Sequence, residues 1–231
     1  MLIEFTLWFA IFRGVHQLSI GGYAREYYLS YVLWAAFVAR ITSSWMYEFK
    51  MIEEVDSGSI NGLLVRPMTF YEYYLSQLLG YKLITSVLSL IFPITVAYLW
   101  HLPTDFSRLP LALLLVTYFL ILVHTISYCV TGVAFFINKV HSLTVAKNLG
   151  LWLLSGELFP LDLLPPFWRH ILLNLPFSSA VYVPVGFVTG RVGISDVLQG
   201  FYSVTLGIVF FALLGNLLWT KGMRDYTGTG A

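Results

Sequence analysis

The chain has 231 residues, of which 58% are hydrophobic and only 11% are charged. Soluble globular proteins carry about 25% charged residues, so this composition excludes a water-soluble domain and indicates an integral membrane protein. The formal net charge of +1 argues against nucleic-acid binding and against a polybasic lipid-binding tail, and the lone cysteine, Cys129, excludes a disulfide or a cysteine-based metal site within one copy.

Six apolar stretches approach or reach the length of a membrane-spanning helix, which needs roughly 20 apolar residues. We therefore predict an all-α integral membrane fold with six transmembrane helices, in which residues 1–231 form a single transmembrane domain. The predicted spans are Leu2–Ile20, Tyr28–Tyr47, Phe70–Trp100, Leu109–Ile137, Leu143–Phe159 and Val197–Trp219.

The first predicted span is short. Leu2–Val15 supplies about 21 Å of helix against a hydrocarbon core of roughly 30 Å, so it crosses only by including His16–Ile20 with local thinning or snorkelling. A signal peptide is the alternative, but a basic start and a small-residue cleavage site are missing. We expect the natural polypeptide to begin upstream of Met1 with a basic amphipathic lead that completes this span.

A polar segment, Glu48–Pro67, follows the second span and holds six charged residues. Its apolar residues recur at helical spacing on either side of Ser57-Gly58, which predicts two short amphipathic helices broken there. Pro67 prevents helix continuation from Arg66, so a new helix is expected to start near Met68. The alternative is an ordinary loop with a solvated charge run. The apolar residues are Phe49, Ile52 and Val55, then Ile60, Leu63 and Leu64.

Lysine placement predicts the orientation. If the spans alternate, all five lysines fall on or just inside one side, and an excess of Lys and Arg marks the cytoplasmic side. We therefore expect the chain to lie in the inner (plasma) membrane of the cell. Residues 48–67 and both termini are expected to face the cytoplasm. One side receives Lys50, Lys82, Lys139, Lys147, Lys221, Arg66 and Arg224, and the other receives Arg25, Arg108, Arg169 and Arg191.

The segment at residues 160–195 is unusual on the outer side, because prolines and glycines interrupt every apolar run in it. It cannot cross as a regular helix, yet it is too apolar for a solvated loop, and broken helix at membrane depth needs protein or a cavity around it. We predict a re-entrant or interfacial helical hairpin in which Pro165-Pro166 opens a helix buried by Phe167 and Trp168. The alternative is an interfacial loop with no mechanistic role.

Three polar residues have both a functional and a structural interpretation. His124, in the middle of a span, is either a ligand or proton relay or a satisfied interhelical histidine. Arg40 is either an intramembrane functional residue or one that snorkels to the interface. Glu157, beside Gly156 at the outer mouth, either meets a cationic substrate or is hydrogen-bonded locally.

Four sequence elements follow one another in a fixed order. They are Val55-Asp-Ser-Gly-Ser-Ile-Asn-Gly-Leu-Leu-Val-Arg-Pro67, Ser155-Gly-Glu-Leu-Phe-Pro-Leu161, Leu175-Pro-Phe177 with Pro184 and Gly190, and Trp219-Thr-Lys-Gly-Met-Arg-Asp-Tyr226 with Gly230-Ala231. From residue 12 onward the chain thereby resembles the type 2 ATP-binding-cassette (ABC) exporter permeases, most closely the daunorubicin-resistance and viologen-efflux subgroup. Such permeases usually begin with a cytosolic surface helix and a complete first span, which this sequence does not show.

The resemblance implies the membrane subunit of an ATP-driven exporter that moves an amphipathic or hydrophobic substrate outward by alternating access. It also implies one half of a twelve-span dimer, formed with itself or with a sister permease, and two ATPase subunits that carry ATP and Mg²⁺, with no cofactor on this chain. The implied ATPase-coupling residues are Glu53, Glu54, Asp56, Ser57, Gly58, Ile60, Leu63, Leu64, Arg66 and Pro67, and the implied outer hairpin contains Gly156, Glu157, Pro160, Pro165, Pro166, Phe167 and Trp168.

Within the coupling element we expect an apolar knob of Ile60, Leu63 and Leu64 that the ATPase buries, with the charged residues at its rim. No Gly-Lys dipeptide, His-Glu-x-x-His or Gly-x-Ser-x-Gly motif occurs, so the chain is expected to be non-catalytic. A secondary transporter, which would need intramembrane carboxylates, and a membrane-embedded transferase, which would need a clustered acid or histidine site, are the alternative classes.

Overall fold

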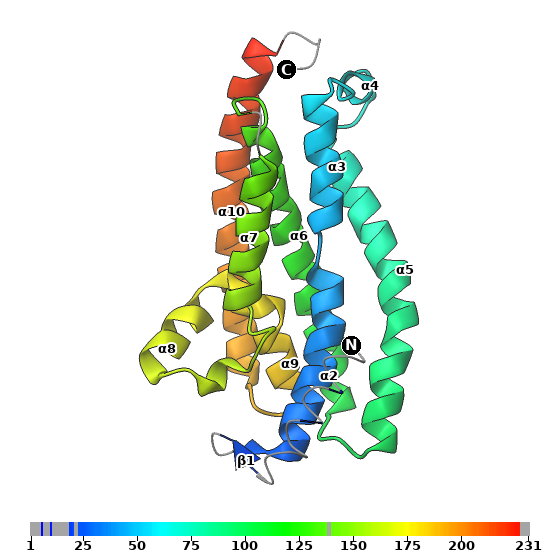
Figure 1. Ribbon diagram of the computed structural model, residues 1–231, viewed down its shortest axis with the longest axis vertical. Coiled ribbons are helices and arrows are strands. Elements are labelled where there is room, and N and C mark those ends of the chain that lie inside the picture. The colour runs from blue at the N-terminus through cyan, green and yellow to red at the C-terminus, as the bar shows by residue number, and fades with distance from the viewer. Residues whose placement is uncertain (1–5, 7–9, 11–18, 21–22, 138–139, 227–231) are drawn as a thin grey trace. The chain divides into compact units, whose positions relative to one another are not determined.

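The structure is a computed structural model that describes residues 6, 10, 19–20, 23–137 and 140–226. The first predicted span therefore lies almost wholly outside the described residues. The described part is helical apart from two paired two-residue strands, which match Ser19 with Ala24 and Ile20 with Tyr23. In chain order the elements of Figure 1 are β1 (Ser19–Ile20), β2 (Tyr23–Ala24), α2 (Arg25–Thr42), α3 (Trp45–Asp56), α4 (Asn61–Leu64), α5 (Phe70–Leu99), η1 (Phe106–Arg108), α6 (Leu109–Val133), α7 (His141–Leu154), η2 (Leu161–Leu163), α8 (Pro166–Asn174), η3 (Pro176–Ala180), α9 (Tyr182–Val188) and α10 (Ile194–Asp225).

Among the described residues, three helices are long and apolar enough to cross a membrane: Phe70–Leu99, Phe106–Val133 and Ile194–Arg224. They correspond to the third, fourth and sixth predicted spans. The second predicted span, Tyr28–Tyr47, is instead broken between α2 and α3, and the fifth ends as a helix at Leu154 rather than at Phe159. The described part of the chain thus has fewer full-length spanning helices than the six predicted.

The break between α2 and α3 falls at Ser43-Ser44. A helix end leaves its last carbonyl groups without amide donors, and these groups need other partners when they are buried. The buried Lys82 of α5 supplies such a partner, because its Nζ donates a hydrogen bond to the Ser43 carbonyl at 2.5 Å.

Helix α5 begins at Phe70, two residues after the predicted start. The reason is a capping box, in which Thr69 and Glu72 exchange hydrogen bonds: the Glu72 carboxylate accepts from Thr69 N at 2.9 Å, and Thr69 Oγ1 accepts from Glu72 N at 3.2 Å. The helix then continues through Pro93 to Leu99.

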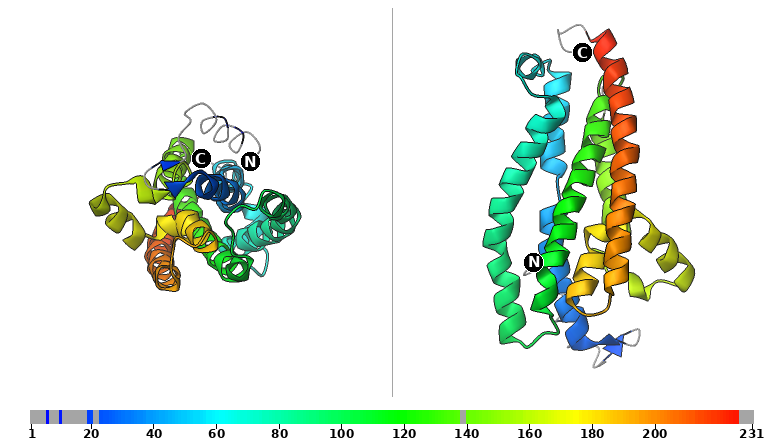
Figure 2. Two further views of the ribbon diagram at one scale, coloured as in Figure 1. Left: turned by 90° about the horizontal axis from the view of Figure 1, so that it is seen from below. Right: turned by 180° about the vertical axis from the view of Figure 1, so that it is seen from behind.

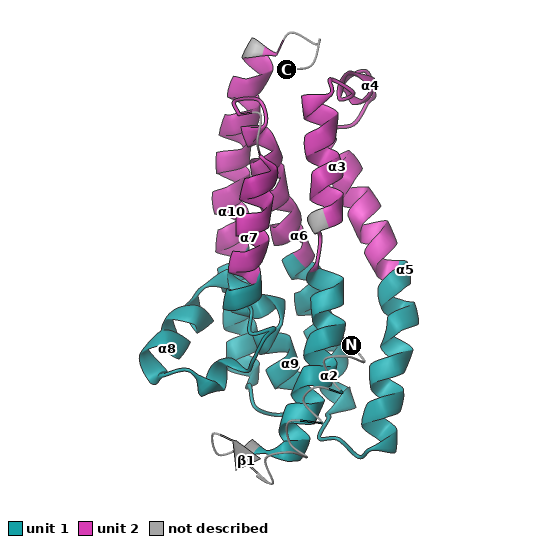
Figure 3. Cartoon of the chain, viewed as in Figure 1, with its two compact units in different colours: residues 1–42, 84–119, 152–204 teal, residues 43–83, 120–151, 205–231 magenta. Residues whose placement is uncertain are grey.

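The chain forms two compact units, each assembled from three separate stretches (Figure 3). Unit 1 contains residues 1–42, 84–119 and 152–204, and unit 2 contains residues 43–83, 120–151 and 205–231. The three long helices α5, α6 and α10 each contribute residues to both units.

In unit 1, α2 is the central helix, since most of its side chains are buried. Polar side chains fix it to two loops. Ser30 Oγ donates to the Pro103 carbonyl at 2.7 Å, Trp34 Nε1 donates to Thr104 Oγ1 at 3.1 Å, and Tyr31 OH donates to the Gly156 carbonyl at 2.7 Å. An apolar cluster of Leu29, Leu33, Ala97 and Leu102 completes this packing.

In unit 2, α6 and α10 approach closely around Trp219. Its Nε1 donates to the Tyr128 carbonyl at 2.9 Å, and its ring stacks on that of Tyr128 with centroids 4.7 Å apart. Glycine makes this approach possible, because a Cβ at Gly215 would lie only 2.8 Å from the Tyr128 ring. Small residues at helix interfaces are a common device of membrane proteins.

Candidate functional site

Helix α3, which carries the first half of the polar segment, is fixed inside unit 2 by a buried ion pair. The Glu48 carboxylate accepts hydrogen bonds from Lys147 Nζ of α7 and from Ser127 Oγ of α6. Lys147 also donates to Ser127 Oγ at 3.3 Å. The Glu48 side chain is fully buried and that of Lys147 is 10% exposed. Because an unpaired buried charge is costly, this cluster holds α3, α6 and α7 together at one point.

His124 extends the polar contacts of unit 2. Its Nε2 lies 2.9 Å from the Tyr71 carbonyl and its Nδ1 lies 3.4 Å from Tyr47 OH, and the side chain is buried. Both ring nitrogens therefore have a neighbour, which is the geometry of a satisfied interhelical histidine. Arg40 lies exposed in the last turn of α2, where a positive charge suits the helix end.

The predicted break at Ser57-Gly58 is present. Helix α3 ends at Asp56, and Gly58 follows with φ of +75°, in the left-handed region that favours glycine. Its N–H donates to the Val55 carbonyl at 3.2 Å, and its own carbonyl accepts from Tyr226 OH at 3.4 Å. The single-turn helix α4 then begins at Asn61. The break is thus a defined turn with hydrogen bonds on both sides.

The structure corrects the predicted apolar knob. Ile60 is fully buried and Leu63 is 7% exposed, so both are already used in packing of the chain itself. Of the predicted three, only Leu64 is exposed, with an exposed fraction of 48%. The exposed apolar surface continues with Val65 and Met68. In the chain by itself, Leu64, Val65 and Met68 are therefore accessible, whereas Ile60 and Leu63 are covered.

The charged and turn residues of the predicted coupling set are divided between two places. Arg66 is exposed, and its guanidinium lies 5.6 Å from the centre of the Tyr73 ring. Pro67 is exposed beside it, and Glu54 is half-buried on α3. Glu53, Asp56 and Ser57 belong instead to a pocket on another part of α3.

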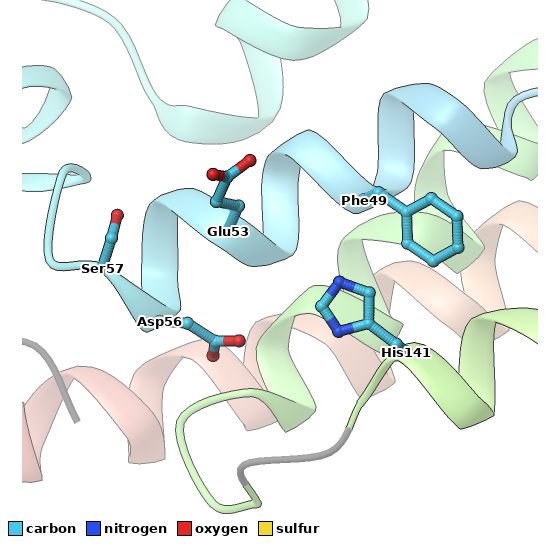
Figure 4. Close-up of a pocket in the computed structure, with 5 residues that line it drawn as sticks. All are labelled: Phe49, Glu53, Asp56, Ser57 and His141. Carbon is cyan, nitrogen blue, oxygen red and sulfur yellow. The ribbon is translucent and has the colours of Figure 1, made fainter.

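This pocket has a volume of about 450 Å³ and is lined by one face of α3 with its C-terminal cap and by the start of α7. The rings of Phe49 and His141 stack with centroids 5.1 Å apart. Figure 4 shows them side by side at one end, with the Asp56 carboxylate turned toward His141. Burial raises the pKa of the Asp56 carboxyl, while the nearby His141 acts in the opposite direction. The lining residues are Phe49, Glu53, Asp56, Ser57 and His141.

The outer segment, in unit 1, is also fixed by a buried carboxylate. The Asp162 side chain is 2% exposed, and its Oδ1 accepts from Tyr182 OH at 2.6 Å and pairs with Arg169 at 3.0 Å. Tyr27 OH of α2 donates to its Oδ2 at 3.4 Å. This cluster ties η2, α8, α9 and α2 together.

Gly156 has φ of +83°, and a Cβ there would lie 2.8 Å from Tyr182 Cβ, so this turn requires glycine. The half-buried Glu157 follows it, and the Glu157 N–H donates to Ser155 Oγ at 3.2 Å. The buried Pro160 then precedes η2. These residues form the ordered entry to the outer segment.

Pro165 caps α8 and Pro166 is its first residue, as predicted. Phe167 and Trp168 are 68% and 56% exposed, so they do not pack against the rest of the chain, and their burial at a membrane interface stays a prediction. Leu172 faces inward instead. Arg169, three residues before Leu172, pairs with Asp162 on this inward side of α8. Figure 1 and Figure 2 show α8 projecting from the rest of that unit.

Apolar helices of spanning length, a broken polar helix and a proline-opened outer helix occur together in this one chain. A family model described as "ABC-2 family transporter protein" matches residues 1–230. The chain belongs to this ABC-2 transporter family. Membership makes it a membrane-embedded permease component of an ABC transporter, and it implies an ABC ATPase subunit as partner. The match does not show the predicted daunorubicin-resistance and viologen-efflux subgroup, and no curated protein matches the chain.

The sequence reasoning missed one part of this ABC-2 permease, the pairing of Glu48 with Lys147. A signal was available, since Lys147 lies within the predicted fifth span and an ionisable residue at membrane depth needs a partner. Glu48 is the first residue of the polar segment, where it counts only as one of six charged residues. Its partner could not be chosen from sequence, because 99 positions separate the two residues.

Proposed function

We propose that this chain is the permease subunit of an ATP-driven exporter that moves an amphipathic or hydrophobic substrate outward by alternating access. Membership of the ABC-2 family supports an export role. The observation that carries the coupling mechanism is the α3–turn–α4 arrangement of residues 45–64. One end of α3 is held by the Glu48–Lys147 pair, and the other leads through Gly58 to the exposed apolar residues at 64–68.

A coupling element must be stiff enough to transmit a displacement. In this proposal an ATPase subunit contacts residues 48–67, with Leu64, Val65 and Met68 in the apolar centre of the contact and Arg66 at its rim. Burial of such apolar side chains contributes more to the binding free energy than charges at the rim of the contact do. Movement of the ATPase then displaces α3, and the Glu48–Lys147–Ser127 contacts pass that displacement to α7 and α6.

The assembly in this proposal is one half of a dimer, formed with a second copy or a sister permease, with two ATPase subunits. ATP and Mg²⁺ are bound by the ATPases, and this chain binds no cofactor. Residues 48–67 and both termini face the cytoplasm, as the lysine distribution predicts. The substrate class follows the resemblance to the daunorubicin-resistance and viologen-efflux subgroup, and the aromatic content of 17% suits such substrates.

Affinity purification from the membranes of the native host tests the complex. We expect an ATPase with a Walker A motif to be retained, to be identified by peptide mass spectrometry, and to hydrolyse ATP at a rate that depends on the permease. Purification of the intact chain without any such ATPase, at several detergents and salt concentrations, would overturn the proposal.

Single cysteines test the orientation. In a Cys129→Ala background, Ser57→Cys and Ser142→Cys should be labelled by an impermeant maleimide only from the cytoplasmic side, and Ser107→Cys only from outside. All three serines are exposed, so reagent access is not limiting. Labelling of positions 142 and 107 from the same side would contradict the alternating topology.

A further inference from the structure

We propose that the α3 pocket receives a basic side chain of the ATPase subunit, and that this side chain is an arginine. The inference rests on the proposed function, because it requires an ATPase to contact this face of α3. The pocket adds a second, charged contact that is separate from the apolar surface at residues 64–68.

The first argument is position. Phe49, Glu53, Asp56 and Ser57 follow one another at helical intervals of four, three and one residues, so they share one face of α3. Glu53, Ser57 and His141 are exposed, and Phe49 and Asp56 are half-buried. The pocket is therefore open along the coupling helix itself, and a side chain from a docked protein can reach it.

The second argument is chemistry. Two carboxylates, Glu53 and Asp56, line the pocket beside the stacked rings of Phe49 and His141. A guanidinium group is planar, binds carboxylates through paired N–H donors and stacks on aromatic faces, so it can use both features at once. A lysine ammonium is a point charge that would use the carboxylates alone. An acidic side chain would be repelled.

The third argument is the partial burial of the Asp56 carboxyl. Asp56 is partly withdrawn from water, and burial raises the pKa of its carboxyl. A cation entering the pocket would stabilise the ionised carboxylate and restore the interactions that burial removes. Figure 4 shows the Asp56 carboxylate on the side of the ring pair, where an incoming guanidinium could contact both.

The fourth argument is rigidity. Glu48 immediately precedes Phe49, and its buried pair with Lys147 joins α3 to α7, the helix that carries His141. Both walls of the pocket are therefore held by the same anchor. A preformed site spends less free energy on ordering its side chains when a partner binds.

The first test measures affinity between the purified permease and its ATPase by titration. The double variant Glu53→Gln/Asp56→Asn should bind the ATPase about tenfold or more weakly, as expected when close charge pairs across an interface are lost. Phe49→Leu should also weaken binding, because it keeps an apolar side chain but removes the stacking surface. The matched control is Glu26→Gln, which removes an exposed acid of α2 outside the pocket and should leave affinity unchanged.

The second test does not depend on variant stability. Ser57→Cys in a Cys129→Ala background is treated in the assembled complex with two cross-linkers, one joining maleimide to phenylglyoxal, which reacts with arginine, and one joining maleimide to a succinimidyl ester, which reacts with lysine. We expect a phenylglyoxal product that mass spectrometry maps to one arginine of the ATPase. Products with lysine alone would overturn the assignment to arginine.

The outcomes separate this inference from the proposed function. If the wild-type permease retains its ATPase, and the double variant binds it with unchanged affinity or no arginine product forms, the pocket assignment is overturned while the exporter proposal stands. If the wild-type chain retains no ATPase at all, both are overturned.

Discussion

The proposed coupling segment at residues 45–68 and the proposed outer segment at residues 156–174 are anchored in the same way but present different surfaces. Each is fixed by a buried carboxylate, Glu48 with Lys147 in unit 2 and Asp162 with Arg169 in unit 1. The coupling segment buries Ile60 and Leu63 and exposes a small mixed surface, whereas α8 exposes the aromatic pair Phe167 and Trp168. An anchored broken helix can thus present either a surface suited to a protein partner or one suited to lipid.

Among the variants that test this comparison, Lys147→Met should have the largest effect on stability, because it leaves the Glu48 carboxylate buried without a counter-charge. We expect a loss of about 3–5 kcal/mol of stability, seen as lower thermal stability of the detergent-purified protein. The double variant Glu48→Gln/Lys147→Met should regain part of that loss, since no unpaired charge remains. Lys221→Met, at an exposed position, is the control. Equal stability of the Lys147 and Lys221 variants would show that the ion pair is no anchor.

Gly58→Pro should have the second-largest effect, a loss of about 3 kcal/mol or more of stability at the turn. Proline cannot adopt the positive φ of this residue, and it removes the N–H that donates to the Val55 carbonyl. We expect ATP hydrolysis to continue while transport per ATP falls sharply, because the segment after α3 takes a different direction. Transport and hydrolysis are measured in vesicles at matched permease content. Gly80→Ala, in α5 and outside the proposed ATPase contact, also has open space around its Cβ position and should change neither.

Serine substitutions test which apolar residues of the coupling segment are buried in the chain and which are exposed to a partner. Leu63→Ser should lower thermal stability by about 2 kcal/mol, because Leu63 is buried in the chain. Leu64→Ser combined with Val65→Ser should leave thermal stability unchanged and weaken ATPase binding by about 1–2 kcal/mol, because these side chains are exposed. The measurements are thermal unfolding and ATPase titration. The reverse pattern would restore the original knob of Ile60, Leu63 and Leu64.

A small effect on stability, within about 0.5 kcal/mol in detergent, is expected for Phe167→Asp combined with Trp168→Asp, because both side chains lie outside the packed part of unit 1. Efflux should nevertheless fall, since two charges replace apolar contacts with lipid. Asp162→Asn is the contrasting variant, which should lower stability by weakening the buried anchor. Normal efflux by the double aspartate variant would show that the exposed face of α8 has no role in transport.

Local signals in the sequence were sufficient for some of these features. The runs of apolar residues located α5, α6 and α10, Ser57-Gly58 located the break after α3, and Pro165-Pro166 located the start of α8. Each of these is set by residues close together in the chain. The interruption at Ser43-Ser44 was missed because serine is tolerated inside an apolar helix, and the deciding partner, Lys82, is 39 positions away.

Burial was harder to predict than helix position. Helical spacing places Ile60, Leu63 and Leu64 near one face, but only the tertiary packing decides which of them the chain itself covers. The same holds for α8, where periodicity defined two faces and the Asp162–Arg169 pair decided which one turns inward. Contacts between separate elements of the fold therefore decide which faces are covered, and the helical period alone does not specify them.

The bond from Lys82 to Ser43 also bears on how the chain is made. Ribosomes synthesise α2 and α3 before residue 82, so the Ser43 carbonyl is inserted before its lysine donor exists. Until then, an unpaired carbonyl in an apolar environment favours a continuous helix, because continuing the helix would satisfy it. The interruption that separates α2 from α3 is therefore expected to form late in biogenesis, after α5 has joined its neighbours in the bilayer.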